Sequence, residues 1–367
     1  MNRDERIRRV GTLLPDWFRE NARPLPWRKD RDPYHVWLSE IMLQQTRAEA
    51  VTSYYERFLA ALPTVDSLAR VEDDKLMKLW EGLGYYSRAR NLKKAAGMIV
   101  NDLGGVFPST YEEIKKLPGV GPYTAGAIAS ICFDLPCPAV DGNVLRVFTR
   151  LTADDGCVDD PRVKKRVEDE LRPLYKPGLC SVITQGLMEL GACVCVPNGR
   201  PKCGVCPLNA VCEANRQEKQ LSYPVRAEKR VRRVEYRTVL LLLHDGKLAL
   251  RKRKNSGLLA GLWEIPNTLA ENEDAATPTG AMAFASALGA EPKELLRQTS
   301  YTHIFTHVEW HMTAFCVTSN NEPEGLVFRT PEEIERGHAL PSAFRPFLEF
   351  AKEIPGMTDK ENDHDPQ

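Results

Sequence analysis

The chain of 367 residues has no apolar run long enough to cross a bilayer, and its arginine-rich N-terminus lacks the apolar core of a signal peptide. It also has no excess of charge, because 50 Lys and Arg residues balance 50 Asp and Glu residues. A neutral chain argues neither for nor against a nucleic acid partner. These absences predict a soluble, intracellular protein that does not associate with membranes.

The ten cysteines are not spread as a disulfide framework would require. Five of them lie within residues 193–212, and the other five are scattered. Disulfide-rich secreted domains are small and distribute their cysteines throughout. A local cluster in a chain of this size predicts a metal site instead.

A chain of this length predicts two domains. Residues 1–215 show helical periodicity, residues 216–236 are a basic linker, and 353–367 form an acidic tail that we expect to be disordered. The segment 34–46 predicts an amphipathic helix, and Ser109 with Glu112 predicts a capping box. Further helices are expected at 48–60, 74–80, 87–103, 143–151, 162–172 and 179–192.

The pattern changes after the linker, over residues 237–352. Two apolar runs flank Asp245-Gly246, which predicts a β-hairpin. Residues 306–319 predict another strand, and residues 342–353 a closing helix. This half is therefore expected to be α+β, and no internal repeat is apparent.

The string "LPGVGPYTAGAIA" (117–129) predicts two helices joined by a glycine hairpin. Gly119 and Gly121 offer backbone freedom, and Pro122 suits the first position of a helix. Amide groups at such a helix start can bind a DNA phosphate without reading any base. A single G-x-G, taken alone, would indicate only a tight corner between helices.

The cysteine run has the spacing Cys195-x7-Cys203-x2-Cys206-x5-Cys212. Short loops of this kind let four sulfur atoms converge on a tetrahedral zinc ion or on an iron–sulfur cubane. Spacing alone leaves both alternatives open.

The glycine hairpin followed by "PAVDGNVLRV" resembles the helix–hairpin–helix DNA glycosylases that carry a Pro/Asp loop. With "PLPWR" (24–28), "VWLSEIMLQQT" (36–46) and "GLGYYSRARNL" (82–92), the chain is similar to the MutY family of adenine DNA glycosylases over nearly its whole length. The segments "SGLLAGLWEIP" and "HIFTHVEW" resemble that family's Nudix-related C-terminal domain. The resemblance implies an all-α helix–hairpin–helix glycosylase domain with an iron–sulfur loop, followed by an α+β Nudix-like domain.

By this resemblance, Glu40 protonates adenine N7 and Asp141 stabilises an oxocarbenium-like sugar, a division of labour that two carboxylates can support. Tyr123 and Asn143 assist Asp141. Without the surrounding motifs, Glu40 would be a surface carboxylate and Asp141 a helix N-cap. Lyase relatives have lysine where this chain has Tyr123, so we expect base excision without efficient strand cleavage.

The resemblance also implies DNA contacts. Gln45 is expected to fill the gap left by the flipped base, and Tyr85 to intercalate beside the opposite lesion. The remaining expected DNA-binding or base-binding residues in this half are Trp27, Arg28, Leu43, Thr46, Gly119, Gly121 and Gln185.

For the cysteines, the resemblance implies one structural [4Fe–4S] cluster held by Cys195, Cys203, Cys206 and Cys212, with Arg200 and Lys202 near DNA. The family spacing begins with x6, so this chain has one extra residue in the first gap. Cys193 is expected to be a spare, buried thiol.

Residues 280–290 lack the glutamates with which Nudix hydrolases hold magnesium, so no nucleotide hydrolysis is expected. By resemblance, Phe305, Thr306 and His307 form the loop that recognises 8-oxoguanine, with threonine in place of the usual serine. The expected substrate is double-stranded DNA with adenine opposite 8-oxoguanine or guanine, bound by a monomer in a bacterial-type cytoplasm at the nucleoid. Two alternative functions are considered. One is a pyrimidine glycosylase with lyase activity, and the other is a catalytically inactive DNA-binding scaffold.

Overall fold

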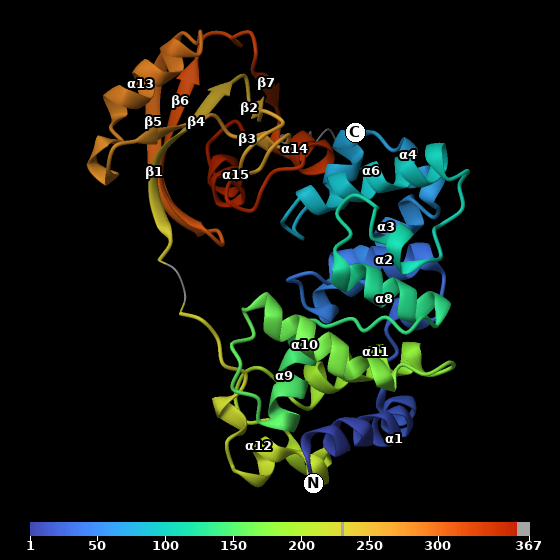
Figure 1. Ribbon diagram of the computed structural model, residues 1–367. Coiled ribbons are helices and arrows are strands. Elements are labelled where there is room, and N and C mark those ends of the chain that lie inside the picture. Colours follow the sequence, from blue (N-terminus) through green and yellow to red (C-terminus); the bar gives the residue numbers. More distant parts are fainter. Residues whose placement is uncertain (229–230, 358–367) are drawn as a thin grey trace, which may run out of the picture. The chain divides into compact units, whose positions relative to one another are not determined.

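The computed structural model describes residues 1–228 and 231–357 (Figure 1). Lys229 and Arg230 of the expected linker, and residues 358–367 of the expected tail, lie outside the described residues. Contacts divide the chain into two units: Met1–Val71 with Arg90–Lys229, and Glu72–Ala89 with Arg230–Gln367. In the part of the chain that the structure describes, no helix combines the length and apolar character needed to cross a membrane.

The first unit is helical and contains no strand among its described residues. Its helices are α1 (Arg3–Asn21), α2 (Pro33–Met42), α3 (Ala48–Ala61), α4 (Val65–Arg70), the end of α6 (Ser87–Asp102), α7 (Tyr111–Ile114), α8 (Pro122–Phe133), α9 (Gly142–Thr152), α10 (Pro161–Leu171), α11 (Cys180–Cys193) and α12 (Glu213–Arg216). One core joins α1, α9, α10 and α11 around Leu14, Phe148 and Leu190. This core fixes α9 and α11, from which several pocket residues project.

Two local predictions in this unit are wrong by small amounts. The helix expected at 34–46 ends at Met42, because the backbone turns there and Gln45 takes a left-handed φ of 60°. The capping box expected at Ser109 and Glu112 does not form; instead Thr110 caps the helix alone, with its hydroxyl accepting the amide of Glu113. In both cases side chain and turn geometry, rather than periodicity, set the boundary.

The second unit contains a mixed sheet with the strand order β3-β2-β1-β6-β5. Its strands are β1 (Arg233–His244), β2 (Lys247–Lys252), β3 (Trp263–Glu264), β4 (Asn267–Ala270), β5 (Pro292–Ile304), β6 (Val308–Ser319) and β7 (Val327–Arg329), and its helices are α5 (Asp73–Leu79), the start of α6, α13 (Pro278–Ala287), α14 (Pro331–Gly337) and α15 (Arg345–Lys352). The predicted hairpin is confirmed, since β1 and β2 pair antiparallel across the left-handed Asp245 and Gly246.

Apolar side chains cover both faces of this sheet. Helix α13 packs on one face, against Leu240, Leu242 and Phe315, and α15 packs on the other, beneath Trp310 and Met312 (Figure 1). The helical first half and the α+β second half together confirm the expected fold class. The strand expected at 306–319 begins at Val308, because residues 305–307 form the turn between β5 and β6.

Candidate active site and cysteine cavity

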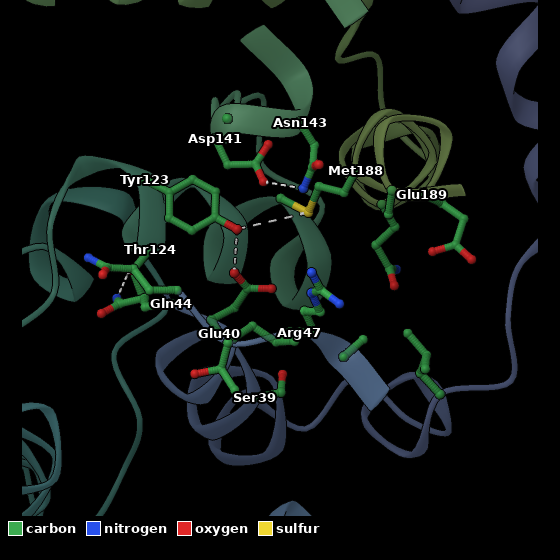
Figure 2. Close-up of a pocket in the computed structure, with 18 of the residues that line it drawn as sticks. Ser39, Glu40, Gln44, Arg47, Tyr123, Thr124, Asp141, Asn143, Met188 and Glu189 are labelled. Atoms are coloured by element: carbon green, nitrogen blue, oxygen red, sulfur yellow. Dashed lines mark hydrogen bonds between the residues drawn. The ribbon is translucent and has the colours of Figure 1, made fainter. Parts of the chain in front are cut away.

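A pocket of about 1010 Å³ opens in the first unit. Its walls come from α2, the glycine hairpin and start of α8, the start of α9, and α11. Sequence segments more than a hundred residues apart meet there, and Figure 2 shows Glu40, Tyr123, Asp141 and Asn143 facing the same space.

Glu40 is almost completely buried, with 5% of its surface exposed. The Tyr123 hydroxyl donates a hydrogen bond of 2.7 Å to its Oε2 (Figure 2). Burial raises the pKa of Glu40 to about 7; the nearby charge of Asp141 adds to the rise, while Tyr123 and Arg28 oppose it. Glu40 is thus not a surface carboxylate, and it can carry a proton near neutral pH.

Asp141 is the N-cap of α9 and also faces the pocket. Its Oδ1 accepts the amide of Val144 at 2.8 Å, and its Oδ2 accepts the side-chain amide of Asn143 at 2.8 Å. Burial raises the pKa of Asp141, although these hydrogen bonds oppose the rise. Helix capping and a pocket-facing carboxylate are therefore compatible in one residue, because the two oxygens have different partners.

The glycine hairpin has the predicted layout, with Gly121 as N-cap and Pro122 opening α8. Gly119 has a φ of +77°, and a Cβ there would lie 2.6 Å from the Cβ of Asn91. Gly121, in contrast, has an extended backbone with a φ of −88° and open space where a Cβ would stand. The prediction that Gly121 supplies unusual backbone freedom is wrong, and only Gly119 does so.

Other predicted residues reach the pocket from several sides. Those that line it are Trp27, Arg28, Leu43, Gln45, Thr46, Gly121 and Gln185, whereas Gly119 does not. Trp27 is buried edge-on against Tyr55, with ring centroids 5.5 Å apart. The Gln185 amide donates to Ser181 Oγ at 3.0 Å. The predicted base pocket thus has one wide apolar ring and several amide groups.

A buried ion cluster in the pocket was not predicted from the sequence. Glu189 on α11 accepts hydrogen bonds from Arg23 Nε at 2.8 Å and from Arg28 Nη2 at 2.9 Å. Burial opposes ionisation, but these two arginines lower the pKa of Glu189 to about 2. Glu189 therefore stays ionised and holds Arg28 in the pocket wall. The "PLPWR" motif pointed to Arg28, but no local signal connected it with a residue 161 positions later.

A second, smaller cavity of about 30 Å³ lies among the cysteines. Cys195, Cys203, Cys206 and Cys212 all line it, and Cys193 does not. Arg150 Nη1 lies 3.3 Å from Cys195 Sγ, and Gln220 Nε2 lies 4.0 Å from Cys203 Sγ. Such donors suit sulfur atoms that carry negative charge. No group of three or more His, Cys, Asp or Glu side chains in the described ranges is arranged for a single metal ion.

Cys193 is half-exposed rather than buried, and its thiol lies 3.6 Å from Glu189 Oε1. The expectation of a buried spare thiol is therefore wrong in its burial. The side chain lies beside Glu189 at the end of α11 and does not line the cysteine cavity.

Helix α9 links the pocket to the cysteine loop through two arginines that sequence analysis did not identify. Arg146 donates to Asn143 Oδ1 at 2.7 Å and to the carbonyl of Cys195 at 2.7 Å. Arg150, one turn later, donates to the carbonyl of Val196 at 3.0 Å. The position of Asn143 thus depends on the conformation of the cysteine loop.

The remaining predicted residues lie in the second unit. Phe305 packs between the rings of His303 and Trp310, with centroids 4.5 and 4.8 Å away. Thr306 and His307 are exposed in the turn before β6. Tyr85, in the Glu72–Ala89 segment of the same unit, has a left-handed φ of 45°, and its hydroxyl forms a hydrogen bond with that of Thr306.

Comparison with known proteins agrees with this arrangement. Residues 38–173 match the HhH-GPD superfamily of base excision DNA repair proteins, and residues 238–350 match the NUDIX domain. Among solved structures, a thermostable thymine-DNA glycosylase is 27% identical with a TM-score of 0.53, covering 58% of this chain and 98% of that one. An endonuclease III bound to DNA is 25% identical with a TM-score of 0.51, covering 59% and 99%.

The similarity to adenine DNA glycosylases extends further along the chain. The rat adenine DNA glycosylase is 34% identical over 352 residues, which cover 81% of this chain and 68% of the rat protein. The adenine DNA glycosylase of Buchnera aphidicola from Acyrthosiphon pisum is 30% identical, and the match covers 83% of this chain and 85% of that protein. The chain therefore belongs to the adenine DNA glycosylase family, within the HhH-GPD superfamily of base excision repair proteins.

Proposed function

We propose that this protein hydrolyses the N-glycosidic bond of adenine paired with 8-oxoguanine, and with guanine, in double-stranded DNA, and that it does so as a monomer. The observation that carries the proposal is the buried Glu40 hydrogen-bonded to Tyr123 opposite Asp141. Releasing adenine requires a proton on the leaving base and a stabiliser for the cationic sugar. This pocket offers a carboxyl group for each task.

Glu40 is the general acid in this proposal. Its pKa of about 7 keeps a large fraction protonated at neutral pH, so it can donate a proton to adenine N7. After bond cleavage the resulting carboxylate can accept a proton from the attacking water. The Tyr123 hydroxyl orients the acid by donating to Oε2, which leaves Oε1 for the base or for water.

Asp141 stabilises the developing oxocarbenium ion. Both of its oxygens are oriented, one by the Val144 amide and one by Asn143, so no reorganisation is needed when positive charge appears on the sugar. Arg146 in turn holds Asn143 from the opposite side.

Extrusion of adenine leaves a gap in the duplex and disturbs base stacking. We propose that two side chains insert between the bases there. Gln45 and Tyr85 are the predicted inserting residues, and both have a left-handed backbone with φ of 60° and 45°. Residues other than glycine rarely adopt this conformation, and such positions cluster at functional sites. The backbone therefore presents these two side chains as exposed tips; Tyr85 is 45% exposed.

The protein is proposed to lack efficient lyase activity. A lyase needs an amine that attacks the sugar and forms a Schiff base, and the position after Gly121-Pro122 is occupied by a phenol. Burial and the charge of Glu40 raise the pKa of Tyr123 well above its usual value. The phenol is thus a hydrogen-bond donor and not a nucleophile.

The second unit is proposed to recognise 8-oxoguanine through Phe305, Thr306 and His307. Phe305 fixes the turn by packing on Trp310, and the Thr306 hydroxyl is at the surface, next to that of Tyr85. Helix α13 carries no glutamate, so magnesium-dependent hydrolysis is not expected here. Threonine retains the hydroxyl and the backbone amide of the serine that is usual in the family.

One [4Fe–4S] cluster is proposed in the cysteine cavity. Its four cysteines line that cavity, and the donors from Arg150 and Gln220 fit thiolate ligands. Bound there, the cluster supplies structural cross-linking of the loop that Arg146 joins to Asn143.

We expect Cys206→Ser to lose most of its iron and at least about tenfold of its excision rate, because the loop then no longer holds Arg146 and Asn143. Iron and acid-labile sulfide per chain, with the visible absorbance, measure the first effect. Cys193→Ser is the matched control and should retain full iron. Full iron in Cys206→Ser, or its loss in Cys193→Ser, would contradict the ligand assignment.

The function is tested by single-turnover assays on duplexes containing A:8-oxoguanine, A:G, A:T or thymine glycol. We expect adenine release opposite 8-oxoguanine and guanine only, with strand breaks that appear after hot alkali and no adduct trapped by borohydride. Strand cleavage without alkali, or cutting at thymine glycol, would favour a pyrimidine-specific lyase. Binding without release of any base would favour a scaffold.

A further inference from the structure

One basic side chain of the pocket lies against the ring of Tyr123 and has no role in the mechanism above. Lys164 on α10 lines the pocket together with Glu40 and Asp141, and its Nζ lies 6.0 Å from the centre of the Tyr123 ring. Among the described residues its ammonium donates no hydrogen bond and forms no ion pair. The Lys164 side chain is half-buried, and the mechanism proposed above gives it no role.

The other basic residues of the pocket differ from it. Arg23 and Arg28 are bound to Glu189, and Arg146 donates to backbone carbonyls. Arg47, the N-cap of α3, also lines the pocket, and Figure 2 labels it beside Glu40. Among the described residues, Lys164 is thus a pocket cation that lies against the Tyr123 ring and forms no ion pair, although its charge interacts with that of Glu168.

Its surroundings indicate an anionic ligand. Gly121 and Pro122 line the same pocket, and the amides of Tyr123 and Thr124 precede the first intrahelical bond of α8, from Ala125 N to Gly121 O at 2.9 Å. These amide dipoles and the Lys164 ammonium contribute positive charge to the pocket wall. The same wall carries the carboxyl groups of Glu40 and Asp141.

An extruded nucleotide brings its own anions into this space. When the sugar lies at Asp141, the phosphates on its 5′ and 3′ sides must remain at the pocket rim, because the strand is continuous. We propose that Lys164 binds one of these two phosphates and so holds the sugar of the extruded nucleotide against Asp141. The inference rests on the proposed function and deepens it by assigning a positioning residue for the substrate backbone.

Because this contact forms only when a nucleotide is extruded, loss of Lys164 should affect binding to DNA with an extruded nucleotide more than binding to undamaged DNA. We expect Lys164→Gln to weaken binding about tenfold for a duplex with a tetrahydrofuran abasic analogue opposite 8-oxoguanine, and about twofold or less for an undamaged duplex. The slope of log affinity against log salt should fall by about 1 on the abasic duplex only. Fluorescence anisotropy across a salt series measures both quantities.

Two variants control this experiment. Lys164→Arg retains the charge and should restore most of the affinity for the abasic duplex. Lys165→Gln removes a neighbouring charge that is turned outward and bound to Asp169 at 2.9 Å, so it should affect neither duplex selectively. In single-turnover assays, Lys164→Gln should raise the enzyme concentration at half-maximal rate, while the rate at saturation changes less than about threefold.

Equal losses on both duplexes would show that Lys164 acts only as surface charge, and no loss would show that it does not contact DNA; either result overturns the inference. The proposed function fails separately, if the wild-type protein releases no adenine. A selective loss on the abasic duplex would then still establish the phosphate contact for a different extruded base.

Discussion

Glu40→Gln is expected to lower the rate of adenine release by at least about 10³-fold while leaving affinity for A:8-oxoguanine DNA within about threefold. The amide keeps the shape of the side chain and can still accept the Tyr123 hydrogen bond, but it has no proton to give to N7. In the wild type, the protonated fraction falls as pH rises through about 7, the pKa of Glu40. The single-turnover rate should therefore decrease about tenfold per pH unit above that value.

The same variant controls for loss of folding, since it should be more stable than the wild type. Glu40 ionises at an ordinary pKa of 4.5 when unfolded and at about 7 when folded. Burying the ionised Glu40 carboxylate lowers the free energy of unfolding. This loss is absent below pH 4.5, grows as pH rises and is complete above pH 7, where it reaches about 3 kcal/mol. Thermal unfolding should show stabilisation of Glu40→Gln at pH 8 and none at pH 4.5. Wild-type excision by this variant would refute the acid assignment.

Sequence patterns were enough to identify the catalytic residues, but not to predict the burial that sets their pKa values. The "VWLSEIMLQQT" and "PAVDGNVLRV" segments identified Glu40 and Asp141, which the structure brings into one pocket. Without those motifs Glu40 would be predicted to be a surface carboxylate, and helical periodicity could not show that only 5% of its surface is exposed. Burial by distant elements decides the pKa, and no local pattern contains that information.

Residues that act through others were missed for the same reason. Glu189 and Arg146 lie in helices that read as ordinary amphipathic segments, and their partners are remote in sequence. Gly121 shows the opposite error. Its presence in a G-x-G motif suggested an unusual φ, but the structure uses Gly119 for that, since a Cβ there would clash with Asn91. The motif identifies the turn without saying which glycine the backbone requires.

Asp141→Asn is expected to lower the excision rate by about 10²–10³-fold, because a neutral amide cannot stabilise the sugar cation. The substitution separates catalysis from capping. Asparagine is as good an N-cap as aspartate, so its Oδ1 can still accept the Val144 amide and α9 should remain folded. If Asp141 were only a cap, the variant would keep nearly full activity.

The new amide also meets a donor, since Asn143 Nδ2 lies 2.8 Å from Asp141 Oδ2 and cannot simply rotate while its Oδ1 accepts Arg146. We therefore expect a modest loss of stability, about 1–2 kcal/mol, besides the loss of rate. Asp160→Asn, at the N-cap of α10, is the matched control for capping and should change neither excision nor pocket binding. Single-turnover rates and thermal unfolding of the two variants, measured together, decide between a charge that acts on the sugar and a carboxylate that only begins a helix.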